Sequence, residues 1–306
     1  MNNNVLISVV GPTAIGKTAL GVHIANYFNS EIISADSRQF FKEMSIGTAV
    51  PSPEELAAAK HHFIQHISIE DQYSVGDFEK EATAKISELF KKHEIVVMVG
   101  GSGMYVKSIL EGLDDFPEID PQIREHLNES LAQNGLQSLQ EQLKKLDPEY
   151  YEKADIENPH RVIRALEICI GTGKKFSSFL NKKKQQRNFD IIEIGLTADR
   201  QKIYDRINLR VDLMMQEGLL AEAKQLYPKR QLNAMNTVGY KELFRYFDQE
   251  IELEFAISEI KKNTRRFAKR QLTWFRKNNN IHWFDYTTKP EQIMMFLSEE
   301  INALNK

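Results

Sequence analysis

A phosphate-binding loop is the clearest chemical signal in this chain. Residues 11–18 read Gly-Pro-Thr-Ala-Ile-Gly-Lys-Thr and fit the pattern G-x-x-x-x-G-K-[ST]. In such a loop, backbone N–H groups and the lysine ammonium hold phosphate oxygens, and the last hydroxyl reaches Mg²⁺. We therefore expect Thr18 to contact Mg²⁺ and the whole loop to bind phosphates: Gly11, Pro12, Thr13, Ala14, Ile15, Gly16, Lys17 and Thr18.

A single carboxylate accompanies this loop. The apolar run 32–35 ends at Asp36, whereas the run 95–99 ends in the glycine-rich turn 100–103. A typical P-loop NTPase places a Mg²⁺-holding acid at such a strand end, and none is found there. Asp36 suits either a base acting on a substrate opposite the phosphates or a structural cap of a turn. The glycines of the turn would either start a helix or let a flat ligand approach the backbone.

Strands alternating with helices position these groups. Apolar runs predict strands at 5–10, 31–35 and 95–99, with helices over 18–28 and 75–93 between them. This order indicates a P-loop NTPase-like parallel α/β sheet, in which ligands bind at the carboxyl ends of strands. The phosphate loop, Asp36 and the glycine turn are therefore expected to converge on one cleft.

The middle of the chain carries only helical periodicity, interrupted near Gly135 and Pro148. We expect a helical insertion domain at 115–187 within an α/β core formed by 1–114 and 188–306. An exposed basic loop is predicted at 182–184. After it, the pattern predicts a strand at 191–196, further helices, and a short edge strand at 281–284.

A basic helix is the second strong signal. Residues 261–277 contain eight lysines and arginines and no acidic residue. Pairs recurring every four residues form one stripe, which is either a solvated face or a contact for an anion such as RNA. Trp274 and Phe275 lie beside the stripe, where they could stack on bases or belong to the core.

Composition places modest bounds on the chain. The 306 residues, 42% hydrophobic and 27% charged, suit a soluble globular protein of one large domain or two, and a net charge of −3 gives no general attraction to nucleic acid. Cys169 is the only cysteine, so an intrachain disulfide is excluded. We expect a cytoplasmic protein without membrane association, because no targeting segment and no apolar run of membrane-spanning length is found.

These motifs, in this order and spacing, make the chain similar to the tRNA dimethylallyltransferases, also called tRNA isopentenyltransferases. The resemblance covers nearly the whole length. It departs at Ile15, where the family often has Ser, and at Ser102, where it often has Thr but a hydroxyl is kept. The matching blocks are 11–18, 33–37, 46–49, 73–78, 100–105, 158–161, 164–167, 210–211, 218–219, 238–242, 264–265 and 268–276.

The resemblance implies transfer of a dimethylallyl group from its diphosphate to the N6 amine of adenosine 37, next to the anticodon of tRNA. The phosphate loop would then hold a diphosphate leaving group, with Mg²⁺, rather than ATP. The resemblance gives Asp36 the role of proton acceptor, and Thr13 and Arg210 that of stabilising the diphosphate. The target base must flip out of its stack to reach a buried cleft.

The resemblance also implies contacts with the anticodon stem-loop, in part from the insertion domain. We expect the protein to act as a monomer. The implied tRNA contacts are Asp36, Ser37, Arg38, Gln39, Ser102, Arg124, His160, Arg161, Val162, Ile163, Arg164, Asn236, Thr237, Val238, Gly239, Tyr240, Lys241, Lys269, Arg270, Gln271, Leu272, Thr273, Trp274, Phe275 and Arg276.

Two other functions compete with this interpretation. A small-molecule P-loop kinase using ATP explains the loop and the insertion but leaves the basic stripe without a role. An RNA-binding ATPase or helicase explains the stripe, but the missing acidic strand end and the short chain disfavour it.

Overall fold

The computed structural model describes residues 4–180 and 187–305. Within them the chain divides into two compact units, an α/β unit of residues 4–111 and 187–305 and a helical unit of residues 112–180. The predicted basic loop at 182–184 lies outside the described residues.

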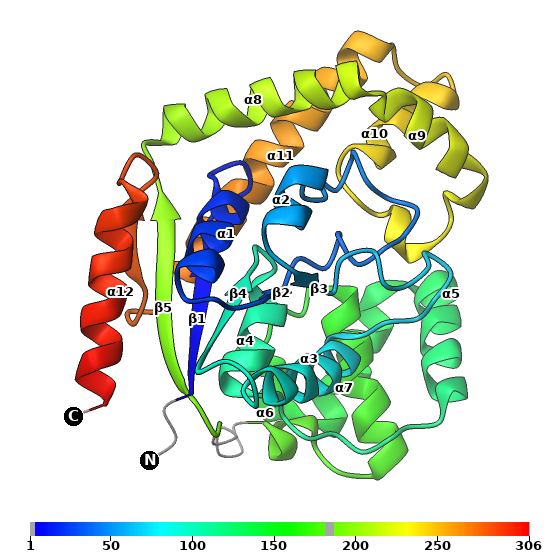
Figure 1. The fold of residues 1–306 in the computed structure, drawn as a ribbon. Coiled ribbons are helices and arrows are strands. Elements are labelled where there is room, and N and C mark those ends of the chain that lie inside the picture. The colour runs from blue at the N-terminus through cyan, green and yellow to red at the C-terminus, as the bar shows by residue number, and fades with distance from the viewer. Residues whose placement is uncertain (1–3, 181–186, 306) are drawn as a thin grey trace. The chain divides into compact units, whose positions relative to one another are not determined.

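A six-stranded sheet forms the centre of the α/β unit (Figure 1). Its strand order is β3-β2-β4-β1-β5-β6, and every pairing is parallel. This architecture confirms the predicted fold class. The strands are β1 (Val5–Val10), β2 (Ile32–Ser34), β3 (His61–His62), β4 (Ile95–Val99), β5 (Asp190–Thr197) and β6 (His282–Asp285).

The side chains of β1 are buried on both faces of the sheet, because helices cover both faces. Successive side chains of a strand point to opposite faces. Val5, Ile7 and Val9 accordingly pack with α1, α8 and α12, whereas Leu6 and Val10 pack with α3 and α4. These helices are α1 (Lys17–Tyr27), α3 (Val75–Leu89), α4 (Gly103–Glu111), α8 (Arg200–Glu217) and α12 (Pro290–Leu304).

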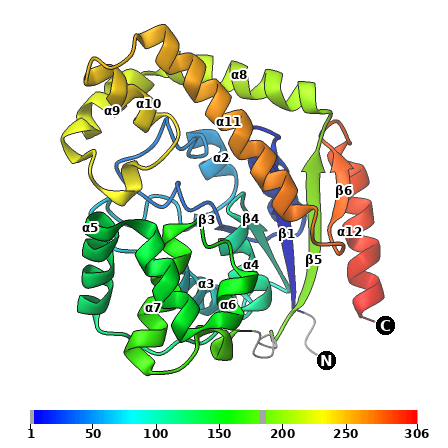
Figure 2. The same cartoon turned by 180° about the vertical axis from the view of Figure 1, so that it is seen from behind.

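A third hydrophobic cluster lies beyond the sheet and is built on Leu219, Tyr240, Leu243 and Ile260. Figure 2 shows the long helix α11 running from this cluster, beside α8, towards the sheet. Phe275 at its last turn packs with the sheet cluster that contains β1 and β4 residues. The elements concerned are α9 (Leu219–Leu226), α10 (Tyr240–Phe247), α11 (Leu253–Phe275) and the short 3₁₀ turns Tyr227–Lys229 and Asn233–Met235.

The described part of the helical unit contains helices without strands, as the sequence predicts. Leu139 and Leu143 of α5 pack with Leu166 of α7 in its core. Gly135 interrupts α5 with a φ of 74° and a ψ of 176°, which explains the predicted break. The elements are α5 (Pro121–Leu146), α6 (Pro148–Lys153), α7 (Pro159–Thr172) and a 3₁₀ turn at Phe176–Phe179.

The structure corrects several element boundaries. The helix predicted over 75–93 ends at Leu89. The two-residue strand β3 was not predicted, because two histidines at a sheet edge carry no apolar periodicity. The capped helix α2 (Pro53–Ala58) was not predicted either. Among the described residues, every helix is too short or too polar to span a bilayer.

Candidate active site

The phosphate loop follows β1 and leads directly into α1. Ala14 and Gly16 adopt left-handed conformations with φ of 63° and 109°, the kind of geometry that lines up successive N–H groups around an anion. Position 11 accepts only glycine, because an added Cβ would lie 2.6 Å from the Leu196 carbonyl oxygen. Since α1 begins at Lys17, the positive end of its dipole also faces the loop.

Lys17 is partly buried within this loop, where its Nζ donates a hydrogen bond to the Pro12 carbonyl at 2.8 Å. Burial lowers the pKa of Lys17 to about 8; the Asp36 carboxylate opposes this shift and Arg210 adds to it. A bound polyanion would favour the charged ammonium again. The site is therefore electrostatically prepared for phosphate groups.

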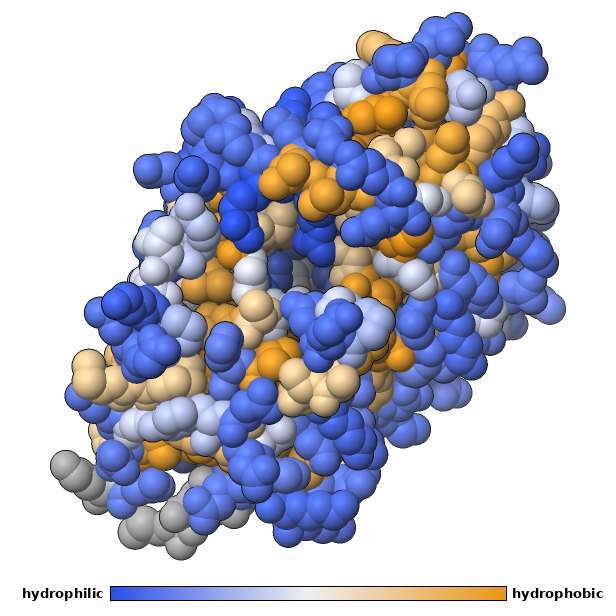
Figure 3. All heavy atoms as spheres, turned by 45° about the horizontal axis from the view of Figure 1, so that its top comes forward, coloured by the Kyte–Doolittle hydropathy of each residue, from blue (hydrophilic) through white to orange (hydrophobic). Residues whose placement is uncertain are grey.

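Three pockets lie side by side and share walls. The phosphate pocket, of about 410 Å³, contains Lys17 and Thr18. An inner pocket of about 60 Å³ and an outer pocket of about 260 Å³ continue from it. Ala49 and Arg210 line all three, so the pockets adjoin one another. Figure 3 looks onto the side of the molecule where α8 lies, and hydrophobic patches interrupt a mainly hydrophilic surface there.

Thr13, Asp36 and Arg210 meet at the junction of the inner and outer pockets. They come from the phosphate loop, the end of β2 and the middle of α8, which are far apart in the sequence. The structure thus brings together the three residues predicted to be catalytic. Lys17 and Thr18 line the inner pocket as well as the phosphate pocket.

Asp36 is surrounded by cations. Its Oδ1 accepts a hydrogen bond from the Arg38 backbone N–H at 3.1 Å. Burial lowers the pKa of both Arg38 and Arg210, and the Asp36 carboxylate opposes the shift in each case. Two carboxylates, Asp36 and Glu55, line the three pockets, and they are outnumbered by cations that include Lys17, Arg38, Arg206 and Arg210. The excess positive charge suits a substrate with a diphosphate.

The glycine turn 100–103 packs closely against protein atoms, and Gly100 also lines the inner pocket. An added Cβ at Gly100 would lie 2.5 Å from the Ala35 carbonyl oxygen, and one at Gly103 would lie 2.3 Å from Trp274 Nε1. The turn then opens α4, as its alternative interpretation predicted.

Ser37 and Ser102 join the turn to the end of β2. The Ser37 N–H donates to Ser102 Oγ at 3.1 Å, and the two hydroxyls are also 3.1 Å apart. These two predicted tRNA contacts are therefore direct neighbours. Gln39 is buried instead, and its Nε2 donates to the Ala49 carbonyl at 2.7 Å.

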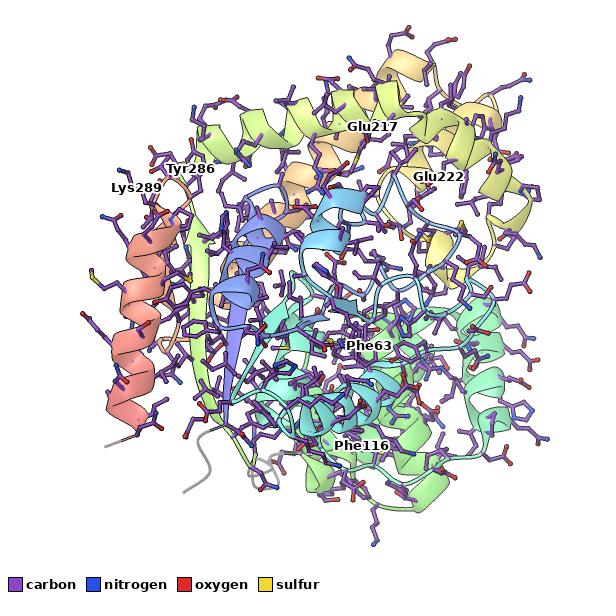
Figure 4. The ribbon with its side chains drawn as sticks, viewed as in Figure 1. Phe63, Phe116, Glu217, Glu222, Tyr286 and Lys289 are labelled. Atoms are coloured by element: carbon purple, nitrogen blue, oxygen red, sulfur yellow. The ribbon has the colours of Figure 1, made fainter. Side chains whose placement is uncertain are left out.

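Glu222 of α9, labelled in Figure 4, holds the loop 45–49 and was not identified from the sequence. Its carboxylate accepts hydrogen bonds from the N–H groups of Ser45, Ile46 and Gly47, each at 2.9 Å. It also accepts one from the Tyr240 hydroxyl at 2.6 Å. Because residues 47–49 line the outer pocket, Glu222 fixes one wall of the site. No local motif in the sequence marks it.

The basic stripe on α11 is divided between two roles. Lys261 pairs with Asp212 of α8 at 2.6 Å, and Arg265 donates to Asn208 of α8 at 2.7 Å. These two side chains fasten α11 to α8, so part of the stripe is compensated within the protein. Lys269 and Arg270 are exposed, and Arg270 also lines the outer pocket.

Residues 236–239 line the outer pocket, as their prediction as substrate contacts requires. Several other side chains in the predicted tRNA-contacting ranges are buried, so they do not face solvent and we confine the proposed RNA contacts to the remainder. Phe275 and Gln271 lie inside the α/β unit, as does Tyr240, and two lie in the helical unit. The buried side chains are Gln39, Val162, Ile163, Tyr240, Gln271 and Phe275, and Thr237 at the outer pocket is buried as well.

The helical unit gathers two of the predicted RNA-contacting arginines. Arg124 of α5 and Arg164 of α7 both pair with the buried Glu167, at 3.2 Å and 3.0 Å. Both arginine side chains remain more than 40% exposed. His160 and Arg161 lie in the first turn of α7, which Asn158 caps. Glu167 therefore presents a pair of cations on one face of this unit.

A sequence model of the IPP transferase family matches residues 39–278. The tRNA dimethylallyltransferase of Christiangramia forsetii is 65% identical over 301 residues, which cover 98% of this chain and all of that protein. That of Flavobacterium johnsoniae is 60% identical and covers 97% of this chain and 98% of its own.

Solved structures give the same assignment. The tRNA isopentenylpyrophosphate transferase of Bacillus halodurans is 39% identical, with a TM-score of 0.72 and 98% of both chains covered. A eukaryotic dimethylallyltransferase acting on tRNA is 27% identical, with a TM-score of 0.82, and the match covers 98% of this chain and 80% of that one.

Proposed function

The chain belongs to the IPP transferase family, and we propose that it is a tRNA dimethylallyltransferase that uses dimethylallyl diphosphate. The acceptor is the N6 amine of adenosine 37, next to the anticodon. One C–O bond of the diphosphate breaks, one C–N bond forms at N6, and the products are N6-dimethylallyladenosine and diphosphate. The observation that carries this proposal is the meeting of Thr13, Asp36 and Arg210 beside a phosphate loop.

The phosphate pocket binds the diphosphate. Lys17 and the N-terminus of α1 neutralise its charge, and Arg210 reaches it from α8. These groups stabilise the negative charge that grows on the leaving diphosphate. No water needs to be activated for this transfer, which is consistent with the glycine turn at the end of β4, where an NTPase would carry an acid.

Asp36 accepts the proton that the N6 amine loses as it attacks. Its position at the junction of the inner and outer pockets places it between the phosphate side and the side lined by residues 236–239. The flipped adenine enters from the outer pocket. Thr13, which lines the same two pockets, helps to orient the diphosphate.

Mg²⁺ fits the donors that line the site. The described residues contain no cluster of three or more carboxylate, imidazole or thiol groups for a metal. Thr18 would therefore hold the ion together with diphosphate oxygens, a hard-oxygen set that Mg²⁺ accepts. Such an ion would supply additional neutralisation of the leaving group.

Exposed cations hold the anticodon stem-loop. Lys269 and Arg270 contribute from α11, and Arg124, Arg161 and Arg164 contribute from the helical insertion. RNA recognition then depends on loop shape and on unstacked bases.

We also propose that the protein acts as a cytoplasmic monomer.

A competition assay tests this function against a small-molecule kinase. The protein is incubated with tRNA, dimethylallyl diphosphate and ATP, with different labels on the dimethylallyl group and on the ATP phosphates. We expect only the dimethylallyl label in tRNA and no consumption of ATP. Steady, tRNA-stimulated release of phosphate from ATP would overturn the proposal.

A further inference from the structure

Gln271 is a polar residue in a buried, otherwise apolar stripe of α11. Ala268 and Phe275, one turn away on either side, are buried in the core, and Gln271 itself is only 5% exposed. A glutamine in such a place is costly unless both its donor and its acceptor are satisfied. Its partners therefore indicate what the position requires.

Both partners belong to the walls of the active site. The Gln271 Oε1 accepts a hydrogen bond from the Thr13 backbone N–H at 2.8 Å. Its Nε2 donates to the Gly101 carbonyl at 2.9 Å. A flipped amide would set an NH₂ group against an N–H and an oxygen against a carbonyl, so only this orientation satisfies both.

The contact orients the first half of the phosphate loop. The Thr13 N–H is committed to α11 and is not available to a phosphate, while the Pro12 carbonyl next to it accepts from Lys17. The peptide segment is thus held from both sides. The orientation of this peptide therefore sets the direction in which Thr13 faces the inner pocket.

Resting on the proposed function, we propose that Gln271 is a positioning residue for the transfer reaction. It acts through Thr13, and fixes the phosphate loop relative to the glycine turn and to α11. The side chain is buried, so it makes no RNA contact of its own, although Lys269 and Arg270 on the same helix are exposed. One helix therefore carries the exposed cations that face RNA and the side chain that fixes the phosphate loop.

The neutral amide is essential to this role. A point at the Cβ position of Gly101 lies 2.4 Å from Gln271 Nε2 and 3.6 Å from Lys17 Nζ, so the amide and the ammonium are neighbours. A carboxylate at position 271 would keep an acceptor for Thr13, but it would attract Lys17 and repel the diphosphate. Glutamine supplies the hydrogen bonds without competing for that charge.

Two variants separate these effects. Gln271→Met keeps the length but loses both hydrogen bonds, and we expect the KM for dimethylallyl diphosphate to rise about tenfold or more, with a lower kcat. Gln271→Glu should be at least about threefold worse than Gln271→Met because of its charge beside Lys17. The Kd for tRNA should stay within about twofold of wild type in both.

Asn278→Leu is the matched control. Asn278 follows α11 and donates to Glu193 at 2.8 Å, so the variant also removes an amide hydrogen bond between this region and the sheet, away from the phosphate loop. We expect lower stability with an unchanged KM for dimethylallyl diphosphate. If the Gln271 variants behaved like this control, the side chain would be structural only and the inference would be wrong.

Titration with inorganic diphosphate and Mg²⁺ measures the affinity of the phosphate loop for diphosphate without turnover. Weaker binding by Gln271→Met, and weaker still by Gln271→Glu, supports the positioning role; equal binding by both variants and wild type contradicts it. A wild-type protein that bound diphosphate but modified no tRNA would overturn the proposed function, and the titration would still decide the role of Gln271.

Discussion

Glu222→Ala removes the acceptor that holds the loop 45–49. Three backbone N–H groups, those of Ser45, Ile46 and Gly47, lose a partner at 2.9 Å, and the Tyr240 hydroxyl loses one at 2.6 Å. Tyr240 is fully buried and the Ile46 and Gly47 N–H groups are partly buried, so water replaces the carboxylate poorly at these three donors. At about 1–3 kcal/mol for each unsatisfied donor, the free energy of unfolding should fall by at least about 3 kcal/mol.

Urea denaturation measures this loss, and the KM for tRNA should rise as well because residues 47–49 line the outer pocket. Tyr240→Phe removes one of the four hydrogen bonds and should cost about 1 kcal/mol, and the double variant should be less destabilised than the sum. Glu88→Ala, which breaks only an exposed pair with Lys85, is the control and should cost under about 0.5 kcal/mol. A Glu222→Ala protein as stable as this control, with an unchanged KM, would refute the reasoning.

Three further predictions follow from the site. Asp36→Ala should lower the single-turnover rate of transfer by about 10²–10⁴ with little change in diphosphate binding, and a rate within a few-fold of wild type would remove Asp36 from the mechanism. The pKa of Lys17 is lowered to about 8, so kcat/KM for dimethylallyl diphosphate should fall by about tenfold per pH unit above that pH as the free enzyme loses the ammonium charge. Lys17→Arg should move this fall to higher pH; an identical profile would assign it to another group. Lys269→Glu with Arg270→Glu should weaken tRNA binding by at least about tenfold and reduce the salt-dependence slope by about 0.7 for each lost phosphate contact, leaving dimethylallyl diphosphate binding unchanged. An unchanged affinity and slope would make these two residues a solvated face.

The sequence predicts the sheet and the phosphate loop because both are encoded locally. Val5–Val10 is an apolar run buried on both faces, and the loop pattern follows it directly. The edge strand near residue 282 was also expected, since a short apolar run followed a long helix. β3 was not, because His61 and His62 form a strand only through their pairing with β2.

The contacts that shape the site could not be predicted, because they join residues distant in sequence. Gln271 reaches Thr13 across 258 positions, and Glu222 reaches Gly47 across 175. The resemblance placed Tyr240 and Phe275 among tRNA contacts, and only the burial of their side chains shows that they face the core. Periodicity could not divide the basic stripe either, because the partners of Lys261 and Arg265 lie on α8.

Nucleoside analysis of the product tests dimethylallyl transfer most directly. In this assay, tRNA is incubated with the protein, Mg²⁺ and dimethylallyl diphosphate and is then digested. The nucleosides are separated and their masses are measured by mass spectrometry. We expect N6-dimethylallyladenosine to replace the single adenosine next to the anticodon, with one diphosphate released for each nucleoside modified. Unmodified tRNA from a folded protein that binds both substrates, or a phosphorylated small molecule formed from ATP, would contradict this function.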